Sequence, residues 1–275
     1  MIRRKGVLLG SVSIVVSFVI FVVPFLFVLV TAMKDRNEAN LLQFSWPTRI
    51  VLWDNLVQVV QARDYQLVIA FVNSTTLTVC SVAILVILGA MVAFVLQRRP
   101  GRWTRIADFL VLAGLIVPPA VVPTIWALQK IGLFRTMTGL ILIEVAFGIS
   151  FTVLLFKAFI ATIPRELDEA AALDGAGPIR MFFQVIFPVL RSVIVTVVVV
   201  QSVAVFNDFA NPLYFLPGDE NATVQLTLFN FSSQFTSQYN LLFTDILLIT
   251  IPPLLMFLFF NRQIVAGQTS GAIKG

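Results

Sequence analysis

Residues 65–97 read YQLVIAFVNSTTLTVCSVAILVILGAMVAFVLQ, a run of 33 residues without one Asp, Glu, Lys or Arg. About 20 apolar residues suffice for a helix to cross a bilayer, so this run predicts a transmembrane helix that is tilted or extends beyond the membrane. Strands of a transmembrane barrel alternate apolar and polar residues over about 10 positions, and this run does not. The stretch therefore favours an all-α membrane protein.

The rest of the chain has the composition of a polytopic membrane protein. Of its 275 residues, 59% are hydrophobic and 12% are charged, whereas soluble domains have about 25% charged residues. Five further uncharged or nearly uncharged runs predict a helical bundle with six spans. We expect the spans at residues 8–32, 65–97, 106–129, 137–158, 191–216 and 241–261.

The basic residues indicate how this bundle is oriented. Six spans place both termini on one side, and thirteen of the 19 Lys and Arg residues fall on that side. By the positive-inside rule, both termini are expected to be cytoplasmic. The basic residues are scattered along membrane borders rather than clustered with aromatic residues, so membrane lipid and not nucleic acid is the expected contact.

Several kinds of chemistry are absent from the sequence. There is no His, the single Cys80 lies inside an apolar run, and no G-x-x-x-x-G-K-[ST] phosphate loop occurs. We therefore expect no catalytic residue, metal site or cofactor in this chain, so any ATP and Mg²⁺ must be bound by partner subunits.

Hydropathy and loop composition suggest an organisation in segments. The external loop should contain an amphipathic helix with Thr48 as its N-cap, because apolar residues recur at helical spacing after it. The expected segments are residues 1–32, the N-terminus and first span; 33–65, the external loop; 66–262, the transmembrane core; 163–190, a cytoplasmic loop within that core; and 263–275, a cytoplasmic tail.

The cytoplasmic loop is the most informative segment, with IPRELDEAAALDGAGPIRMFFQVIFP at residues 163–188. Pro164 is expected to open a short helix whose first turns hold several acids, where the helix dipole favours them. Gly175 and Gly177 should break the chain, and Pro178 should begin a second, amphipathic helix. Such a helix–turn–helix is shaped to enter a groove on another protein, although an ordinary connection lying on the membrane surface is the alternative.

This loop resembles the cytoplasmic EAA loop of ABC importer permeases, whose pattern is E-A-A, three residues, G, nine residues, I-x-L-P. Glu169, Ala170, Ala171 and Gly175 match it, and the segment ending at Pro188 departs by Val for Ile and Phe for Leu. Residues 267–275 resemble the G-x-T-x-G-A-[VI]-K-G tail of carbohydrate permeases of the maltose-transporter type. Residues 206–209, FNDF, are similar to a W-N-[ED]-F segment of the same permeases.

The resemblance implies a MetI-like, binding-protein-dependent permease fold and a function as one permease subunit of an ATP-driven carbohydrate importer, not an enzyme. It implies a second homologous permease, two cytoplasmic ATPase subunits and an extracytoplasmic sugar-binding protein as partners, in a bacterial cytoplasmic (inner) membrane. The residues implied in ATPase coupling are Glu166, Asp168, Glu169, Ala170, Ala171, Asp174, Gly175 and Pro188, and those of the tail are Gly267, Gly271, Lys274 and Gly275. A passive channel or secondary transporter of small polar solutes is the alternative function.

Three acids lie within the expected spans, namely Glu144, Asp208 and Asp245. A charge facing lipid is costly, so these side chains should face the protein interior or a water-filled vestibule. Asn207 and Asn211 should share a helix face beside Asp208, because they lie about one turn apart. These groups could bind sugar hydroxyls or hold an outer gate, or they could simply hydrogen-bond between helices.

Two proline pairs are expected to kink their spans. Pro118-Pro119, followed by Pro123, lies near the middle of the third span, and Pro252-Pro253 lies in the sixth. Proline removes a hydrogen bond from the helix ladder. Such kinks border transport pathways in some bundles and only pack helices in others.

Overall fold

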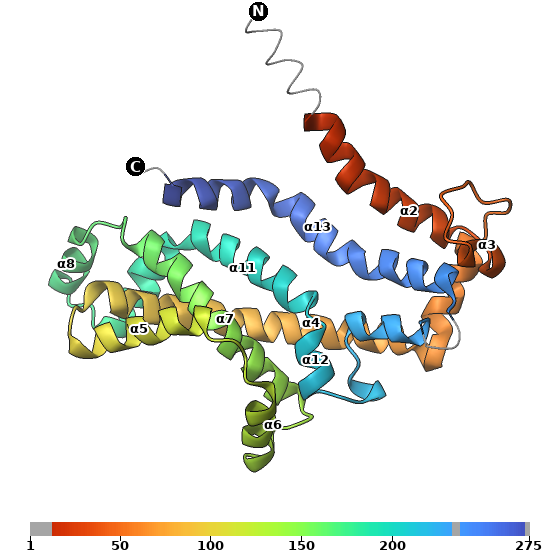
Figure 1. Cartoon of the computed structure of the whole chain (residues 1–275). Helices are drawn as coiled ribbons and strands as arrows, with labels where there is room; N and C mark the ends of the chain where they lie inside the picture. Colours follow the sequence, from red (N-terminus) through yellow and green to blue (C-terminus); the bar gives the residue numbers. More distant parts are fainter. Residues whose placement is uncertain (1–12, 233–236, 273–275) are drawn as a thin grey trace, which may run out of the picture. The chain divides into compact units, whose positions relative to one another are not determined.

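The computed structural model describes residues 13–232 and 237–272, with side chains described up to residue 260 (Figure 1). Apart from an isolated bridge between Ser232 and Ser237, the described chain consists of helices and their connections. The helices are η1 (Phe18–Val22), α2 (Val23–Ala32), α3 (Arg36–Asn40), α4 (Leu52–Arg98), α5 (Arg102–Ile116), α6 (Val121–Lys130), α7 (Met137–Ile160), α8 (Glu166–Leu173), α9 (Pro178–Met181), η2 (Phe182–Ile186), α10 (Phe187–Val189), α11 (Arg191–Phe206), α12 (Ala210–Phe215), η3 (Asp219–Asn221), η4 (Val224–Asn230) and α13 (Tyr239–Ala272).

The expected all-α membrane fold is confirmed. Within residues 13–232 and 237–272, four helices are long and apolar enough to cross a membrane: Ser13–Ala32, Leu52–Arg98, Met137–Ile160 and Tyr239–Phe260. Two pairs of helices reach this length only together, α5 with α6 at a bend of 119° and Pro178–Val189 with α11 at a bend of 78°. Four of the six expected spans thus correspond to the long helices and the third to the pair of α5 and α6, whereas the expected fifth span, 191–216, covers α11 and α12 (Ala210–Phe215) with a break after Phe206.

The chain divides into two compact units. The first contains the described residues up to Phe71 together with Val224–Ile251, and the second contains Val72–Thr223 together with the described residues from Pro252. Helices α4 and α13 contribute to both units. The division falls after Phe71 in α4 and after Ile251 in α13.

The first unit is joined by side-chain amides where α2, α4 and α13 meet. Buried Asn55 donates from Nδ2 to the carbonyl oxygens of Ala32 at 2.8 Å and Lys34 at 2.9 Å, and its Oδ1 accepts from Nδ2 of Asn240 at 2.8 Å. Lys34 is also buried, and its ammonium group donates to the carbonyl of Gln43 at 2.8 Å. Paired in this way, the polar groups are stable away from water.

The helix expected in the external loop is present, but its expected start is wrong. α4 begins at Leu52, four residues after Thr48, so Thr48 is not its N-cap, and the backbone N–H of Thr48 donates to the carboxylate of Glu38 at 3.2 Å. The backbone leaves helical geometry at residues 62–65, where Arg63, Asp64 and Tyr65 have positive φ. The short first part of α4 is therefore separated by this break from the 33-residue apolar run.

The second unit has two apolar cores. The first joins α4, α7, α11 and the segment from α9 to α10, and the second joins α4, α6, α7, α11 and α12. The buried residues of the first are Val82, Val86, Ala90, Ala93, Val153, Phe156, Ile160, Ile163, Phe182, Ile186, Leu190, Val193 and Val197. Those of the second are Leu77, Leu128, Leu140, Ile143, Val205, Phe215 and Leu216.

The interruption expected at Pro118-Pro119 is confirmed, and it is a complete break between two helices rather than a kink within one. α5 ends at Ile116, α6 begins at Val121, and the two axes differ by 119°. Because proline has no backbone N–H, neither proline can extend the ladder of α5. Pro123 lies in the first turn of α6, where proline is tolerated. Pro252 and Pro253 lie within the continuous helix α13.

A polar contact and a glycine bring three helices of the second unit together. The amide of buried Gln201, in α11, donates to Oγ1 of Thr152 at 2.8 Å and to the carbonyl of Gly148 at 3.2 Å, both in α7. The methyl group of Thr152 lies against Gly89 of α4 so closely that a Cβ on Gly89 would overlap with it. Small residues allow membrane helices to approach in this way.

We predict that Gly89→Ala lowers the stability of the protein in detergent by about 1–3 kcal/mol, the usual cost of overpacking. Thr152→Ser removes the obstructing methyl group and keeps the oxygen that accepts from Gln201, so it should restore part of the loss in the double variant. Thermal unfolding measures both effects. Gly101→Ala is the control, since its Cβ would have only Thr104 Oγ1 at 3.7 Å nearby. An unchanged unfolding temperature for Gly89→Ala would contradict this account.

Candidate functional site

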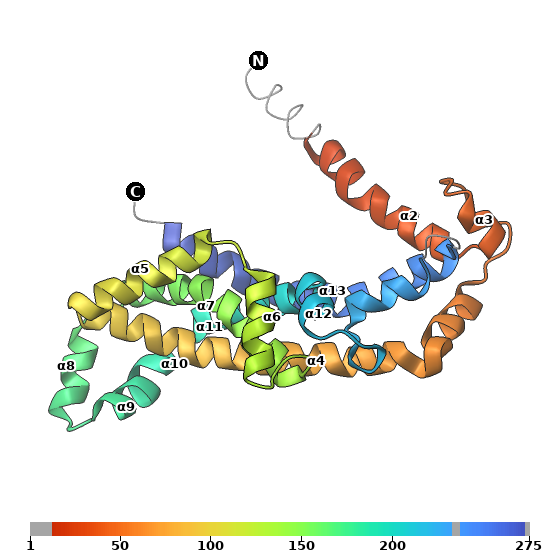
Figure 2. The ribbon, with the colours of Figure 1, turned by 60° about the horizontal axis from the view of Figure 1, so that its bottom comes forward.

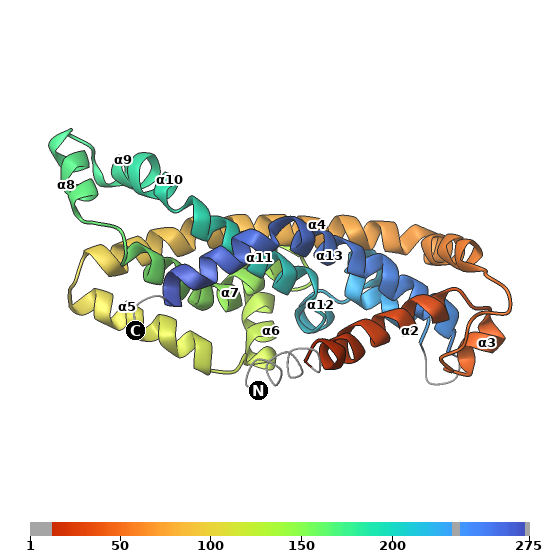
Figure 3. The same cartoon turned by 90° about the horizontal axis from the view of Figure 1, so that it is seen from above.

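Residues 163–190 form a helical hairpin that we call the α8–α10 hairpin. It comprises α8, a turn at residues 174–177, and α9, η2 and α10 in one line of helix. Figure 2 shows α8 leaving the end of the second unit where α4 and α5 meet, and Figure 3 shows α8 and α9 projecting beyond these two helices. The hairpin expected from the sequence is therefore present and stands clear of the bundle of its own unit.

The first helix of the hairpin carries the acids at its N-terminal end. Arg165 is the N-cap, and its carbonyl accepts from the N–H groups of Asp168 at 2.9 Å and Glu169 at 3.1 Å. Glu166 lies with these two acids in the first turn, where the positive end of the helix dipole stabilises negative charge. Ala171, one turn after Asp168, is buried.

The turn of the hairpin depends on one glycine. Gly175 has φ +76°, and its N–H donates to Ala172 while the N–H of Ala176 donates to Ala171. This pair of bonds is the Schellman arrangement that ends helices at a left-handed residue. Asp174 is the C-cap of α8. Gly177 has φ −66°, which any residue adopts, so only Gly175 needs the freedom of glycine.

The second half of the hairpin is partly buried and partly exposed. Phe182 and Ile186 lie in the first apolar core, whereas Ile179 is 74% exposed and Phe183 is 43% exposed. The expected single amphipathic helix contains a π-helical segment, η2, which the sequence did not indicate. Pro188 lies at the start of α10, two residues before the bend into α11.

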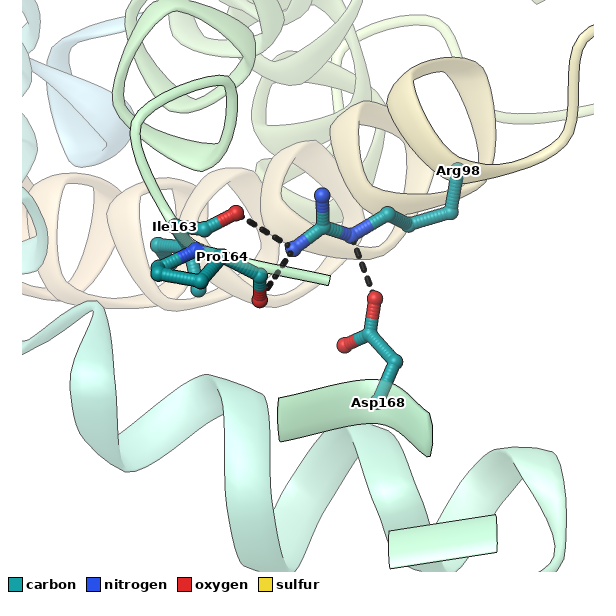
Figure 4. Close-up of polar contacts among 4 residues, drawn as sticks. All are labelled: Arg98, Ile163, Pro164 and Asp168. Carbon is teal, nitrogen blue, oxygen red and sulfur yellow. Dashed lines mark hydrogen bonds and ion pairs between the residues drawn. The ribbon is translucent and has the colours of Figure 1, made fainter. Parts of the chain in front are cut away.

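Arg98, the last residue of α4, holds the first half of the hairpin (Figure 4). Its Nε lies 2.6 Å from Oδ2 of Asp168, and its Nη2 donates to the carbonyls of Ile163 at 3.0 Å and Pro164 at 3.5 Å. The side chains of Arg98 and Asp168 are 10% and 17% exposed. A partly buried, charge-assisted contact of this kind is stronger than a surface ion pair.

The acids expected within the spans do not form one group. Glu144, in α7, is buried and accepts from the amide of Asn211 at 3.2 Å, and the Asp208 carboxyl group also interacts with that of Glu144. Asp208 caps α12 by accepting from the N–H groups of Ala210 at 2.8 Å and Asn211 at 3.3 Å. Asp245 belongs to the other compact unit, where it accepts from Thr227 at 2.9 Å.

The helix face expected for Asn207 and Asn211 is not formed. α11 ends at Phe206 and α12 begins at Ala210, so the two residues lie on either side of a break in the expected fifth span. Asn207 instead donates to the carbonyl of Val203 at 3.0 Å. The physical reason is Asp208, whose carboxylate competes for the amides that a continuous helix would have used.

Comparison with known proteins places this hairpin in a family context. Residues 85–268, about two thirds of the chain, match the family described as "Binding-protein-dependent transport system inner membrane component". The chain belongs to this family. The matched range contains the α8–α10 hairpin and Arg98, so the elements described above lie in the part of the chain that defines the membership.

Individual relatives are transport permeases. The chain is 32% identical to the diacetylchitobiose uptake system permease protein NgcG of Streptomyces coelicolor, over 98% of this chain and 90% of that protein. It is 31% identical to the melibiose/raffinose/stachyose import permease protein MelC of Bacillus subtilis, over 75% and 76%. It is 34% identical to the trehalose transport system permease protein SugB of Mycobacterium tuberculosis, over 75% and 77%.

A solved structure has the same fold. A chain of a bacterial ABC transporter involved in the import of the acidic polysaccharide alginate superimposes with a TM-score of 0.80 at 15% identity, over 94% of this chain and 96% of that chain. The relationship to ABC importer permeases inferred from the sequence is thus confirmed. This family member is a multi-pass membrane protein of a binding-protein-dependent system.

The expected tail residues are only partly described by the structure, and Arg98 was not expected as a site residue. Backbone helix α13 continues through Gly267 and Gly271 to Ala272, and Lys274 and Gly275 lie outside the described residues. Arg98 was missed as a site residue, because a basic residue at the end of a span reads as a topology signal. Asp168 also has Arg165 three residues before it as a possible local partner, so the sequence gave no signal for Arg98.

We predict that Asn211→Leu destabilises the permease by about 1–3 kcal/mol, because buried Glu144 loses its amide donor. Replacing both partners, Glu144→Met with Asn211→Leu, should recover much of the stability, since no buried polar group is then left without its partner. Thermal unfolding of the three proteins measures this. A double variant less stable than Asn211→Leu alone would contradict the assignment.

Proposed function

We propose that this chain is a permease subunit of an ATP-driven importer that moves a carbohydrate into the cytoplasm. Sugar transport is the function in the names of its relatives, which import diacetylchitobiose, melibiose-type oligosaccharides or trehalose. A second permease, two ATPase subunits and an extracytoplasmic sugar-binding protein complete the proposed complex, and the ATPases bind the ATP and Mg²⁺. The alginate transporter was crystallised with an oligosaccharide-bound periplasmic protein, which supports the last of these partners.

The observation that carries the proposal is the α8–α10 hairpin. It projects from its unit, and its first helix, α8, exposes the acids Glu166 and Glu169 in its first turn and Leu173, which is 89% exposed, at its last residue before the turn. A large apolar side chain among charges on a projecting turn is typical of a surface that another protein covers. We propose that the ATPase covers this surface and contacts both the acids and residues 170–174.

We also propose that both termini are cytoplasmic and that residues 267–275 contact the ATPase subunits. The distribution of the basic residues supports the orientation. Small residues at Gly267 and Gly271 allow close approach of another chain along the last part of α13, which supports the contact.

The proposed function is tested by purifying the chain from its native membrane and measuring uptake in proteoliposomes. An ATPase should co-purify with it in a fixed ratio, and sugar uptake should require both ATP and the binding protein. A passive channel or a secondary transporter would give uptake without ATP. Purification of the chain without any ATPase would exclude the proposed function.

We predict that Gly175→Val abolishes ATP-driven uptake while the protein still inserts into the membrane. Valine at φ +76° costs about 1–2 kcal/mol and shifts the turn that places α8 against α9. The Cβ itself would meet nothing within 4 Å, so the effect is on the backbone and not on packing. Gly177→Ala is the matched control in the same turn, because its φ of −66° suits alanine. Wild-type uptake by Gly175→Val would show that the turn has no coupling role.

The orientation gives a further prediction. In a Cys80→Ser background, Arg49→Cys and Asp219→Cys should react with a membrane-impermeant thiol reagent added to intact cells, and Arg102→Cys should react only after lysis. All three native side chains are exposed. Labelling of Arg102→Cys in intact cells would reverse the topology.

A further inference from the structure

One guanidinium group links α4 to the α8–α10 hairpin at three points. Nε of Arg98 pairs with Asp168 in the first turn of α8, and Nη2 donates to the carbonyls of Ile163 and Pro164 just before that helix. These carbonyls belong to the short connection between α7 and α8. The contact therefore fixes both the start of α8 and the connection that would otherwise act as its hinge (Figure 4).

The geometry of this contact requires arginine. A planar guanidinium can present donors in two directions at fixed angles, whereas an ammonium group is a point charge on a flexible stem. The side chain of Arg98 is 10% exposed and that of Asp168 is 17% exposed, so solvent screens the pair only weakly. The neighbouring Arg99 is exposed, and no ion pair of Arg99 occurs in the described part of the chain.

The second half of the hairpin is attached to the same end of α4 by apolar contacts. Phe94, one turn before Arg98, has its ring centroid 5.6 Å from that of Phe182 in η2. Phe182 and Ile186 share the first apolar core with Ala90 and Ala93 of α4. The hairpin is thus held to α4 twice, at α8 by Arg98 and at η2 by the core.

The two attachments differ in what would remain if one were lost. Without Arg98, η2 would still be packed in the core, and α8 would keep its contacts with η2 and its buried Ala171, but it would lose the side-chain link to the end of α4. A force applied to α8 would then bend the connection at 161–165 and the turn at Gly175. With Arg98 in place, α8 cannot move without moving the end of α4.

We propose that Arg98 is a positioning residue that locks α8 to α4, so that movement of the hairpin by the ATPase is transmitted to a membrane-spanning helix. The proposal rests on the proposed function, in which the hairpin contacts the ATPase. It concerns how efficiently movement is transmitted and not whether the hairpin contacts the ATPase. The exposed residues Glu166, Glu169 and Leu173 are still present when Arg98 is changed.

The experiment uses the purified whole complex in proteoliposomes with its binding protein, and the readout is sugar transported per ATP hydrolysed. Arg98→Ala should lower this ratio about fivefold or more, because the two sites lose a coupling interaction of ordinary size. The ATPase should still co-purify in the wild-type amount. Arg98→Lys keeps the charge and loses the fork, so it should give an intermediate ratio and guards against a folding defect in the alanine variant. Arg99→Ala is the matched control and should behave as wild type.

A double variant identifies the interaction responsible. If Arg98 acts through Asp168, then Arg98→Ala combined with Asp168→Asn should be no worse than the poorer single variant, because both remove the same contact. Effects that multiply in the double variant, or a wild-type ratio in Arg98→Ala, would overturn the proposal. The proposal would also be overturned if Arg98→Ala and Arg98→Lys failed to co-purify the ATPase while the wild type and Arg99→Ala retained it, because Arg98 would then act in assembly. Failure of the wild-type chain to co-purify an ATPase would instead refute the proposed function.

Discussion

A segment in the hydrocarbon of a bilayer must satisfy its backbone hydrogen bonds within the protein, and this requirement shapes both the helices and their interruptions. Where α5 ends, two successive prolines have no N–H to satisfy, and the ladder starts again at the carbonyl of Ala120, which accepts from the backbone N–H of Thr124 at 3.1 Å and from its hydroxyl at 2.8 Å. Where α11 ends, the carboxylate of Asp208 accepts from two amides of α12. The backbone bonds are thus completed by a new helix at the first break and by a side chain at the second.

Completed backbone hydrogen bonds also give the α8–α10 hairpin a defined shape where it leaves the bundle. The carbonyls that follow α7 are taken by Arg98, and the carbonyls at the end of α8 are taken by the Schellman bonds around Gly175. The backbone carbonyls on both sides of α8 are therefore paired. Before the helix they accept from the guanidinium group of Arg98, and at its end they accept from the N–H groups of the turn at Gly175. A projection built in this way can be rigid without being buried.

Much of this architecture could be predicted from local patterns in the sequence. Hydropathy predicted the long helices, the proline pair predicted the break after α5, and the acids, alanines and glycines of the loop predicted the hairpin and its turn. Contacts between distant residues could not be predicted. Arg98 and Asp168 lie about 70 residues apart, and no pattern in a single sequence pairs them.

Local rules also failed where a side chain competed with them. The spacing of Asn207 and Asn211 is that of a helix, but Asp208 between them ends one helix and begins another. Thr48 has the chemistry of an N-cap, but the helix begins four residues later, at Leu52, and Thr48 instead contacts the carboxylate of Glu38.

The hydrogen bond between Asn55 and Asn240 has a consequence for biogenesis. The two residues are separated by 185 positions, yet the first unit is joined through them. At a synthesis rate of about 5–20 residues per second, Asn240 emerges roughly 10–40 s after Asn55. During that time the amide oxygen of Asn55 must be satisfied by water, lipid headgroups or an insertion factor. The amino-terminal part of the chain thus waits for the last span, and completion of the first unit requires that Val72–Thr223 of the second unit have already been synthesised.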